Sequence, residues 1–242
     1  MKKDDKIDKL NRPYITVILA MSIDGKIADF NRSPAKFASA TDKLHLQTQI
    51  AGTDAVMLGR ATLNAYGTSI LIKAPPLLQQ RTEQGKPPQP IHIICSGAGT
   101  LDPTLPFFSQ PIRRWLLQGA GSKITASPPF DQVLTIPTDA AGNFNWQQGL
   151  SQLKSQGINR LAVLGGGHLI SSLITINSVD EFWLTICPLI LGGKQAPTPV
   201  DGPGFPTELA PQVQLLTVKT IDNEVFLHYR RKTGKEELSI NN

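Results

Sequence analysis

The sequence predicts an α/β domain in which helices cover both faces of a mixed, mostly parallel sheet. Two nearly continuous apolar runs, at residues 14–20 and 54–59, are typical of strands that are covered on both faces. A third run, at 160–164, passes through three consecutive glycines into a helical pattern. The chain then closes with two strand-like segments joined by a turn at Asp222-Asn223. Strands that alternate with helices and end in an antiparallel pair define this fold class.

The composition is that of an ordinary globular protein. The 242 residues are 40% hydrophobic and 18% charged, and the formal net charge is +5. This length allows one large α/β domain or two small ones, and we find no repeat or internal boundary. The charge suits an anionic small molecule, but without a Lys/Arg cluster on a helix it does not indicate nucleic-acid binding.

The cysteines, the histidines and the lengths of the apolar runs bear on the compartment, on metal binding and on membrane insertion. Cys95 and Cys187 lie in separate strand-like runs, which indicates free buried thiols and a reducing, cytoplasmic compartment. The four histidines are isolated in sequence, so no metal site is expected. No run of eighteen apolar residues predicts a membrane span. We expect a disordered tail at 1–12, one domain at 13–231 and a polar tail at 232–242.

The first strand and the first helix have clear boundary signals. Asp24-Gly25 is a strong turn signal directly after the strand at 14–20. Ser39, followed three residues later by Asp42, predicts the start of a helix that Gly52 ends. Loops at strand ends are where α/β sheets bind ligands, so the Asp24 turn is a candidate site.

The next segment combines a second candidate site with a long irregular stretch. Gly59 ends the strand at 54–59, and the Thr62 hydroxyl could meet a phosphate at the start of the following helix. Between Gly67 and Pro90 the periodicity fades and proline, glutamine and lysine dominate. This predicts a surface loop, either a lid over a site or an inert connection.

The remaining elements follow from apolar runs separated by turn residues. They are strands at 91–95, 112–117, 132–136, 160–164, 179–191, 213–220 and 224–230, and helices at 146–156 and after Gly167.

The glycine triplet Gly165-Gly166-Gly167 is the strongest local indication of a ligand. Glycine has no Cβ and permits positive φ, so the backbone N–H groups at the following helix N-terminus can approach a phosphate. Such a turn predicts a nucleotide pyrophosphate site. The triplet does not complete the Gly-x-Gly-x-x-Gly fingerprint, so a tight turn without a ligand is the alternative.

Four segments together carry a family resemblance: Ala20–Ala28, Thr53–Thr62, Gly165–Leu169 and Val179–Thr198. In order and spacing they resemble the reductase of riboflavin biosynthesis. That reductase is the C-terminal part of the bacterial bifunctional deaminase-reductase and a stand-alone enzyme in archaea and fungi. No cytidine-deaminase-like zinc motif precedes the segments, so the chain resembles the stand-alone form.

The resemblance implies a dihydrofolate-reductase-like three-layer fold, NADPH as hydride donor and a homodimer formed through C-terminal strands. It also implies which residues meet NADPH. These are Ala20, Met21, Asp24, Gly25, Gly59, Arg60, Thr62, Ser96, Gly165, Gly166, Gly167, His168 and Leu169. Ser96 follows a strand where the family often contacts the 2′-phosphate.

On the substrate side the chain departs from the family pattern. Ile50 replaces an arginine, Tyr66 begins a segment that replaces Asp-Asp-Pro, and Leu164 replaces an acidic residue before the glycine turn. We expect these three residues to line the substrate pocket. Lys26, Lys36 or Arg60 could supply polarity from another direction.

Three functions remain open at this point. The first is reduction of 5-amino-6-(5-phosphoribosylamino)uracil by NADPH, with the protein supplying orientation and electrostatics. The second is reduction of another small substrate, a pterin or a carbonyl compound, on the same fold. The third is a nucleotide-binding module without catalysis. No catalytic residue is identified from the sequence.

Overall fold

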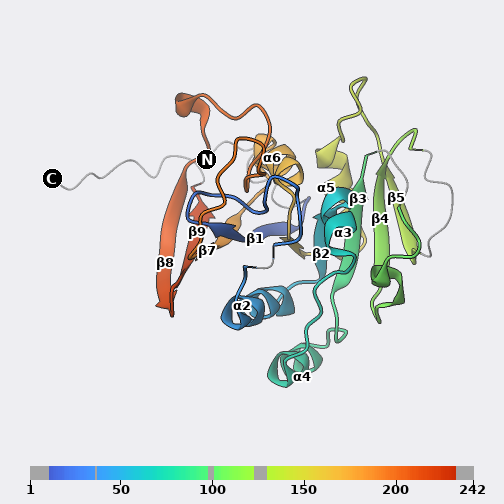
Figure 1. Cartoon of the computed structure of the whole chain (residues 1–242). Coiled ribbons are helices and arrows are strands. Elements are labelled where there is room, and N and C mark those ends of the chain that lie inside the picture. Colours follow the sequence, from blue (N-terminus) through green and yellow to red (C-terminus); the bar gives the residue numbers. More distant parts are fainter. Residues whose placement is uncertain (1–10, 36, 98–100, 123–129, 233–242) are drawn as a thin grey trace.

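The computed structural model describes residues 11–35, 37–97, 101–122 and 130–232 (Figure 1). Its strands are β1 (Tyr14–Ser22), β2 (Ala55–Gly59), β3 (Ile91–Ser96), β4 (Arg114–Gly119), β5 (Gln132–Ile136), β6 (Arg160–Val163), β7 (Glu181–Cys187), β8 (Val213–Ile221) and β9 (Glu224–Arg231). Its helices are α2 (Ala40–Ala51), α3 (Arg60–Tyr66), α4 (Pro75–Glu83), α5 (Trp146–Ser155) and α6 (Gly167–Thr175), with short 3-10 turns η1 (Pro106–Ser109) and η2 (Thr207–Leu209).

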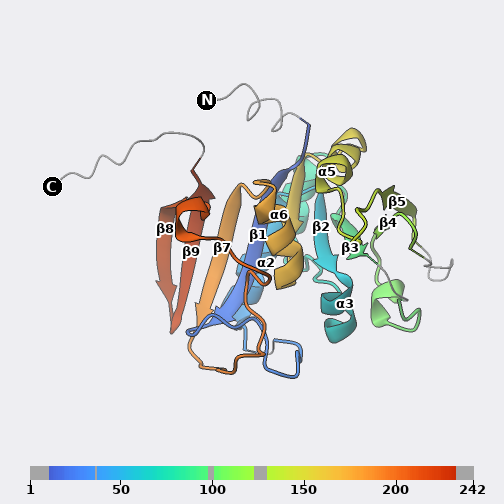
Figure 2. The ribbon, with the colours of Figure 1, turned by 90° about the horizontal axis from the view of Figure 1, so that it is seen from above.

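The strands form one sheet in the order β5-β4-β3-β2-β6-β1-β7-β9-β8. The pairings from β5 to β7 are parallel, and the β7–β9 and β9–β8 pairings are antiparallel. Figure 1 shows α6 above this sheet and α2 and α4 below it, and Figure 2 shows the same strands from above. The predicted mixed sheet with a closing antiparallel pair is therefore confirmed.

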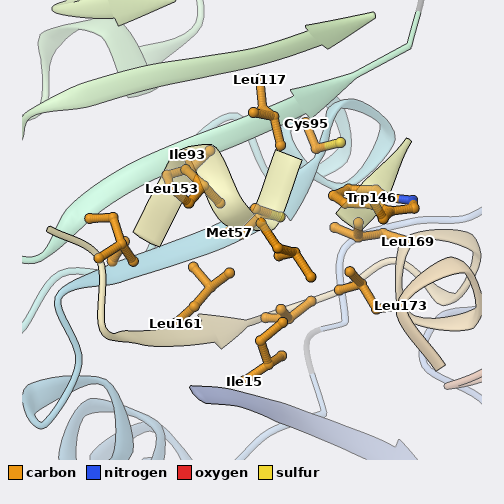
Figure 3. Packing of buried hydrophobic residues seen from close by; sticks show 14 of the residues in the cluster. Ile15, Met57, Ile93, Cys95, Leu117, Trp146, Leu153, Leu161, Leu169 and Leu173 are labelled. Carbon is orange, nitrogen blue, oxygen red and sulfur yellow. The ribbon is translucent and has the colours of Figure 1, made fainter. Parts of the chain in front are cut away.

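Side chains alternate between the two faces of the sheet, and each face has its own core. Ile15 and Met57 face the layer of α5 and α6, where Leu153 and Leu173 pack against them (Figure 3). On the opposite face, the α2 residue Ile50 joins a cluster with β1 and β2 side chains. Each fully buried aliphatic side chain contributes about 1.5–3 kcal/mol to folding. These two cores hold the sheet ends at fixed positions.

Residues 75–83 form helix α4 inside the segment for which the sequence predicted only a loop. Pro75 and Pro76 occupy the first turn of this helix, where the N–H that proline lacks has no intrahelical partner. The prolines therefore mark a helix start, and the expectation of a continuous loop was wrong.

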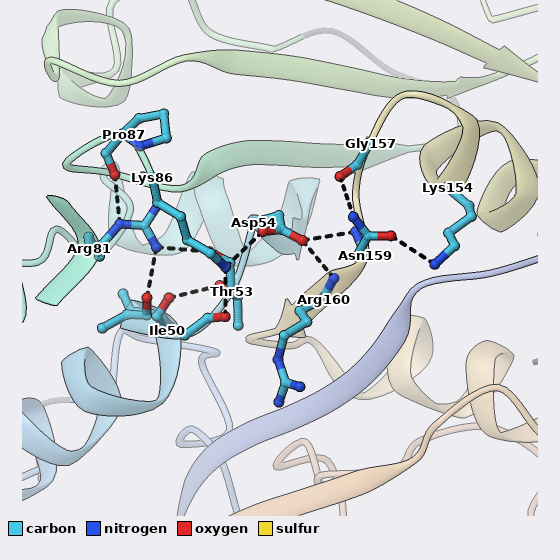
Figure 4. A network of polar contacts seen from close by, with 12 residues as sticks. Ile50, Thr53, Asp54, Arg81, Lys86, Pro87, Lys154, Gly157, Asn159 and Arg160 are labelled. Carbon is cyan, nitrogen blue, oxygen red and sulfur yellow. Dashed lines mark hydrogen bonds and ion pairs between the residues drawn. The ribbon is translucent and has the colours of Figure 1, made fainter. Parts of the chain in front are cut away.

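Helix α4 is fixed by Arg81, whose side chain is 1% exposed. The guanidinium donates to the carbonyl oxygens of Ala51 at 2.9 Å, Thr53 at 2.8 Å and Pro87 at 2.7 Å (Figure 4). These three carbonyls lie at the end of α2, before β2 and after α4. One buried cation therefore joins segments that are far apart in sequence.

A second polar contact lies beside Arg81 in the same view (Figure 4). Lys86 Nζ donates to Asp54 at 2.8 Å, and the other oxygen of this carboxylate accepts the backbone N–H groups of Asn159 and Arg160, each at 2.9 Å. Asp54 thus ties the start of β2 to the start of β6. The relative position of these two strands matters because β6 leads into the glycine turn and the end of β2 hydrogen-bonds to it.

Several predicted boundaries differ from the structure, and two of the differences have a clear physical cause. The strand expected at 179–191 ends at Cys187, because Pro188 has no N–H to donate to a strand ladder. Arg12, which the sequence assigned to a tail, is 5% exposed and donates to the Asp180 carboxylate at 2.7 and 2.9 Å. The rest of the predicted tails, at 1–10 and 233–242, lies outside the described residues.

Replacing Arg81 with Ala should lower the free energy of unfolding by about 3 kcal/mol or more, because three buried carbonyl oxygens lose a charged donor. Urea denaturation measures this change. Lys86→Ala is the matched control, since its ion pair is partly exposed and should cost about 1 kcal/mol or less. Equal losses in the two variants would contradict the role given to Arg81.

Candidate active site

A cavity of about 1300 Å³ opens where β1, β2, β3 and β6 end. Parallel strands bring their carboxyl ends to one edge of the sheet, which is where α/β sheets bind ligands. The strand ends contribute Ala20, Gly59, Ser96 and Leu164 to the wall. The volume exceeds the size of a typical small-molecule site, so a dinucleotide and a second ligand can lie there together.

The glycine turn between β6 and α6 forms the middle of the cavity wall. Gly165 has φ +111°, and the N–H of Gly59 donates to its carbonyl oxygen at 3.0 Å. A Cβ on Gly167 would lie 2.4 Å from the carbonyl oxygen of Thr198 and 2.7 Å from Asp201 Oδ2. No side chain fits at that position.

The start of α6 leaves backbone donors available at this turn. Its N-cap is Gly166, which supplies no side-chain hydrogen bond to the first helical turn. A Cβ built on Gly166 would lie 3.4 Å from Thr62 Oγ1, so the Thr62 hydroxyl faces the turn across a short gap. Uncapped N–H groups, the helix dipole and a hydroxyl together suit an anionic oxygen.

Most residues predicted to meet the cofactor come together in this cavity. Those that line it are Ala20, Gly59, Arg60, Thr62, Ser96, Gly165, Gly166, Gly167, His168 and Leu169. Ser96 is 2% exposed, and its Oγ has no hydrogen-bond partner. His168 is exposed at the second position of α6, whereas Leu169 is also part of the core.

Met21, Asp24 and Gly25 do not line the cavity. Asp24 instead accepts the backbone N–H groups of Leu191 at 3.1 Å and Gly192 at 2.7 Å. The Ser22 hydroxyl donates to the same carboxylate at 2.7 Å, and together these donors lower the pKa of Asp24 to about 2. Asp24 thus ties the turn after β1 to the loop that follows β7.

Only some of the residues predicted for the substrate side line the cavity. Leu164 and Tyr66 line the cavity, and the Tyr66 hydroxyl accepts the backbone N–H of Ala35 at 3.0 Å. Ile50 does not reach the cavity, because its side chain points from α2 into the core and is fully buried there. Lys26 donates to the carbonyl oxygen of Ala196 at 3.3 Å, away from the wall. Lys36 lies outside the described residues.

Polar residues that the sequence did not indicate line the same half of the cavity. Lys43 on α2 and Lys73 before α4 are exposed cations at its edge, together with Arg32. Gln47 brings α2 and the Lys73 segment together, since its Oε1 accepts the Lys73 N–H at 2.6 Å. Asp42 contributes a carboxyl group to the wall. Of these residues, the sequence indicated only Asp42, as part of a helix start and not as a site residue, so only the fold brings them together.

The described part of the chain also limits what the site can be. It brings together no group of three histidine, cysteine or acidic side chains that could hold a metal ion. In the same residues, no helix has both the length and the apolar character needed to cross a membrane.

A glycine turn beside a large cavity at the ends of parallel strands defines an α/β protein with a ligand site at the carboxyl edge of its sheet. Residues 13–227 match the model of the RibD C-terminal domain, and the chain belongs to that family. It is therefore an oxidoreductase of the riboflavin-biosynthesis reductase family. The predicted family is confirmed.

The named relatives include proteins of this length and one that is longer. The chain is 31% identical over 197 residues to the 2,5-diamino-6-ribosylamino-4(3H)-pyrimidinone 5′-phosphate reductase of Archaeoglobus fulgidus, with 80% of this chain and 89% of the relative covered. The reductase of the same name from Methanothermobacter thermautotrophicus is 26% identical, with 91% and 99% covered. The chain is also 24% identical over 230 residues to the riboflavin biosynthesis protein RibD of Bacillus amyloliquefaciens, with 93% of this chain but only 59% of that protein covered.

A solved structure supports the fold. The pyrimidine reductase-like protein of Corynebacterium diphtheriae superposes with a TM-score of 0.74 at 17% identity, and 94% of this chain and 95% of that chain are covered. This likeness concerns the three-layer α/β architecture.

Proposed function

We propose that this protein uses NADPH to reduce a 6-ribosylaminopyrimidine 5′-phosphate in riboflavin biosynthesis. The observation that carries this proposal is a single cavity with two chemically different ends. One end is lined by glycine backbone and helix N-termini, and the other carries lysines at its edge. The names of the full-length relatives agree with this substrate class.

The residues present fit NADPH. The three glycines line the cavity without side chains, and the partnerless Ser96 Oγ is a buried polar group that a ligand can satisfy. Gly165–Gly167 and Thr62 would hold the pyrophosphate, and Ser96 would contact the 2′-phosphate. When bound, the cofactor supplies hydride from C4 of its nicotinamide.

Calorimetry should give NADPH a Kd in the micromolar range or below, about −8 kcal/mol, and a weaker Kd for NADH. Ser96→Asp should weaken NADPH binding about tenfold or more, since a carboxylate repels the 2′-phosphate, and should leave NADH binding unchanged. Ser96→Ala, which adds no charge, is the matched control. Equal affinity of the wild-type protein for the two cofactors would show that Ser96 does not select NADPH.

The substrate end of the cavity suits a phosphorylated sugar. Lys43, Lys73 and Arg32 supply positive charge at its edge, and a phosphate group pairs favourably with such cations. Leu164 and Tyr66 offer apolar surface for a pyrimidine ring. The polarity that the family places at other positions is thus supplied here from α2 and from the segment before α4.

Two forms of the substrate differ only at C2 of the pyrimidine. The sequence favoured the uracil form, with a carbonyl group, whereas the stand-alone relatives are named for the diamino form. NADPH oxidation followed at 340 nm with each compound should give a kcat near the enzyme median of about 10 per second for at least one. Cofactor binding without turnover of either would favour a pterin or carbonyl substrate. Absence of cofactor binding as well would favour a module without catalysis.

We also propose a homodimer formed through the C-terminal strands, in the cytoplasm. On the edge strand β8, Leu215, Val218 and Ile221 are 46%, 54% and 42% exposed, and an apolar edge of this kind is normally covered. The buried free thiols Cys95 and Cys187 suit a reducing compartment, which cell fractionation would test.

Light scattering should give twice the chain mass of 26.3 kDa. Val218→Lys, which places a charge on β8, should shift the mass toward that of one chain. Lys219→Ala, a neighbouring substitution without added charge, should keep the dimer. A wild-type protein with the mass of one chain at micromolar concentration would contradict the proposed assembly.

A further inference from the structure

We infer that Asp42 is the proton donor of the reduction, with Glu224 as the neighbour that sets its protonation. This inference rests on the proposed function. Asp42 is an acidic residue of the cavity wall, 7% exposed, on the first turn of α2.

The carboxyl group of Asp42 is not used to cap its own helix. In a capping box, an acidic side chain at this position accepts the backbone N–H of the N-cap residue. Here the N–H of the N-cap Ser39 donates to Glu224 Oε1 at 3.2 Å, and the Ser39 hydroxyl donates to Glu224 Oε2 at 2.6 Å. Glu224, from β9, therefore accepts the N–H of the N-cap residue in place of Asp42. The Asp42 carboxyl remains available to the cavity.

The two neighbouring carboxyl groups have different surroundings. Glu224 is 4% exposed and accepts three hydrogen bonds, two from Ser39 and one from the Cys187 thiol at 3.7 Å. The Thr185 hydroxyl is the side-chain hydrogen-bond partner of Asp42. Two carboxyls whose environments differ in this way take different protonation roles. Of the two, Asp42 accepts fewer hydrogen bonds, and it is therefore the carboxyl that we assign as the proton donor.

The charged and titratable groups around Asp42 come from four elements. Glu224 on β9 and Cys187 on β7 lie on its sheet side, Lys43 is its neighbour on α2, and Tyr66 lies on α3. Burial is the main cause that raises the pKa of Asp42 above its ordinary value, and the Glu224 charge adds to it. The Thr185 hydrogen bond and Lys43 act in the opposite direction. A raised pKa favours the protonated form that a general acid needs.

The reaction requires one proton for each hydride. Hydride adds to C1′ of the ribosylamine, the C1′–O4′ bond breaks with its electron pair going to O4′, and NADPH becomes NADP⁺. O4′ takes the proton of the Asp42 carboxyl, and the open-chain ribityl product results. The Asp42 carboxylate then regains a proton from water at the open side of the cavity.

Asp42→Asn keeps the shape of the side chain but removes the acid. We expect kcat to fall about 100-fold or more, within the usual range for loss of general acid catalysis, while the Kd for NADPH stays the same. In the wild-type enzyme, kcat/KM should fall as pH rises through the pKa of Asp42, and this limb should be absent in the variant. Asp102→Asn, an exposed aspartate outside the cavity, is the control and should behave as the wild-type enzyme.

Glu224→Gln tests the same inference without altering the acid itself. Removing the neighbouring charge should move the alkaline limb to lower pH. Infrared difference spectra of wild-type minus Asp42→Asn should show a protonated carboxyl band that disappears over the same pH range, and no substrate is needed for this measurement. If the wild-type enzyme turns over and the Asp42→Asn variant is equally fast, the inference is wrong although the proposed function stands. The same holds if the alkaline limb of kcat/KM does not shift in the Glu224→Gln variant. Absence of wild-type turnover with both pyrimidine substrates would instead overturn the proposed function and this inference with it.

Discussion

The close approach of the glycine turn to its neighbours is the constraint on which the site depends. The Gly59 N–H donates to the Gly165 carbonyl oxygen at 3.0 Å, which joins the end of β2 to the turn after β6. On the far side, the loop at Thr198 and Asp201 leaves no room for a Cβ on Gly167. Because three segments approach so closely here, the turn presents backbone N–H groups to the cavity, with the Thr62 hydroxyl beside them.

Three polar side chains connect the segments that surround this turn. Arg81 joins α4 to the segment between α2 and β2, and Asp54 joins the starts of β2 and β6. The Asp24 carboxylate joins the turn after β1 to the loop after β7. All three act at loop ends, where apolar packing alone would leave the backbone free to move. The sheet core supplies most of the stability, and the anchors set the geometry of its edge.

Cap and turn residues in the sequence correctly predicted the elements whose ends depend on neighbouring residues. Ser39 and Gly52 bound α2 as expected, and the turn at Asp222-Asn223 joins β8 and β9. Helix α4 was missed because its anchor, Arg81, contacts carbonyl groups about thirty positions away, which no window of sequence contains. Its prolines also resemble those of a loop when their place in the first turn is unknown.

The two ends of the cavity also differ in whether local motifs or contacts between distant residues form them. The end that we propose for the cofactor is lined by Gly59, Thr62 and the glycine triplet, which lie in short motifs and could be predicted. The substrate end draws Asp42, Lys43 and Lys73 from separate elements, and the expected Ile50 faces the core instead. Asp42 was visible in the sequence only as a helix-start signal. Its position beside Glu224 depends on a contact between residues more than 180 positions apart.

Both ends belong to one cavity, so hydride is expected to pass directly from cofactor to substrate. The most direct measurement uses NADPH carrying deuterium at C4 of the nicotinamide, prepared in each of its two stereoisomers, with the product analysed by mass spectrometry and NMR. Direct transfer predicts one deuterium at C1′ of the ribityl product, from only one of the two stereoisomers. A product that carries no deuterium from either stereoisomer, with the new hydrogen coming from water, would contradict this account.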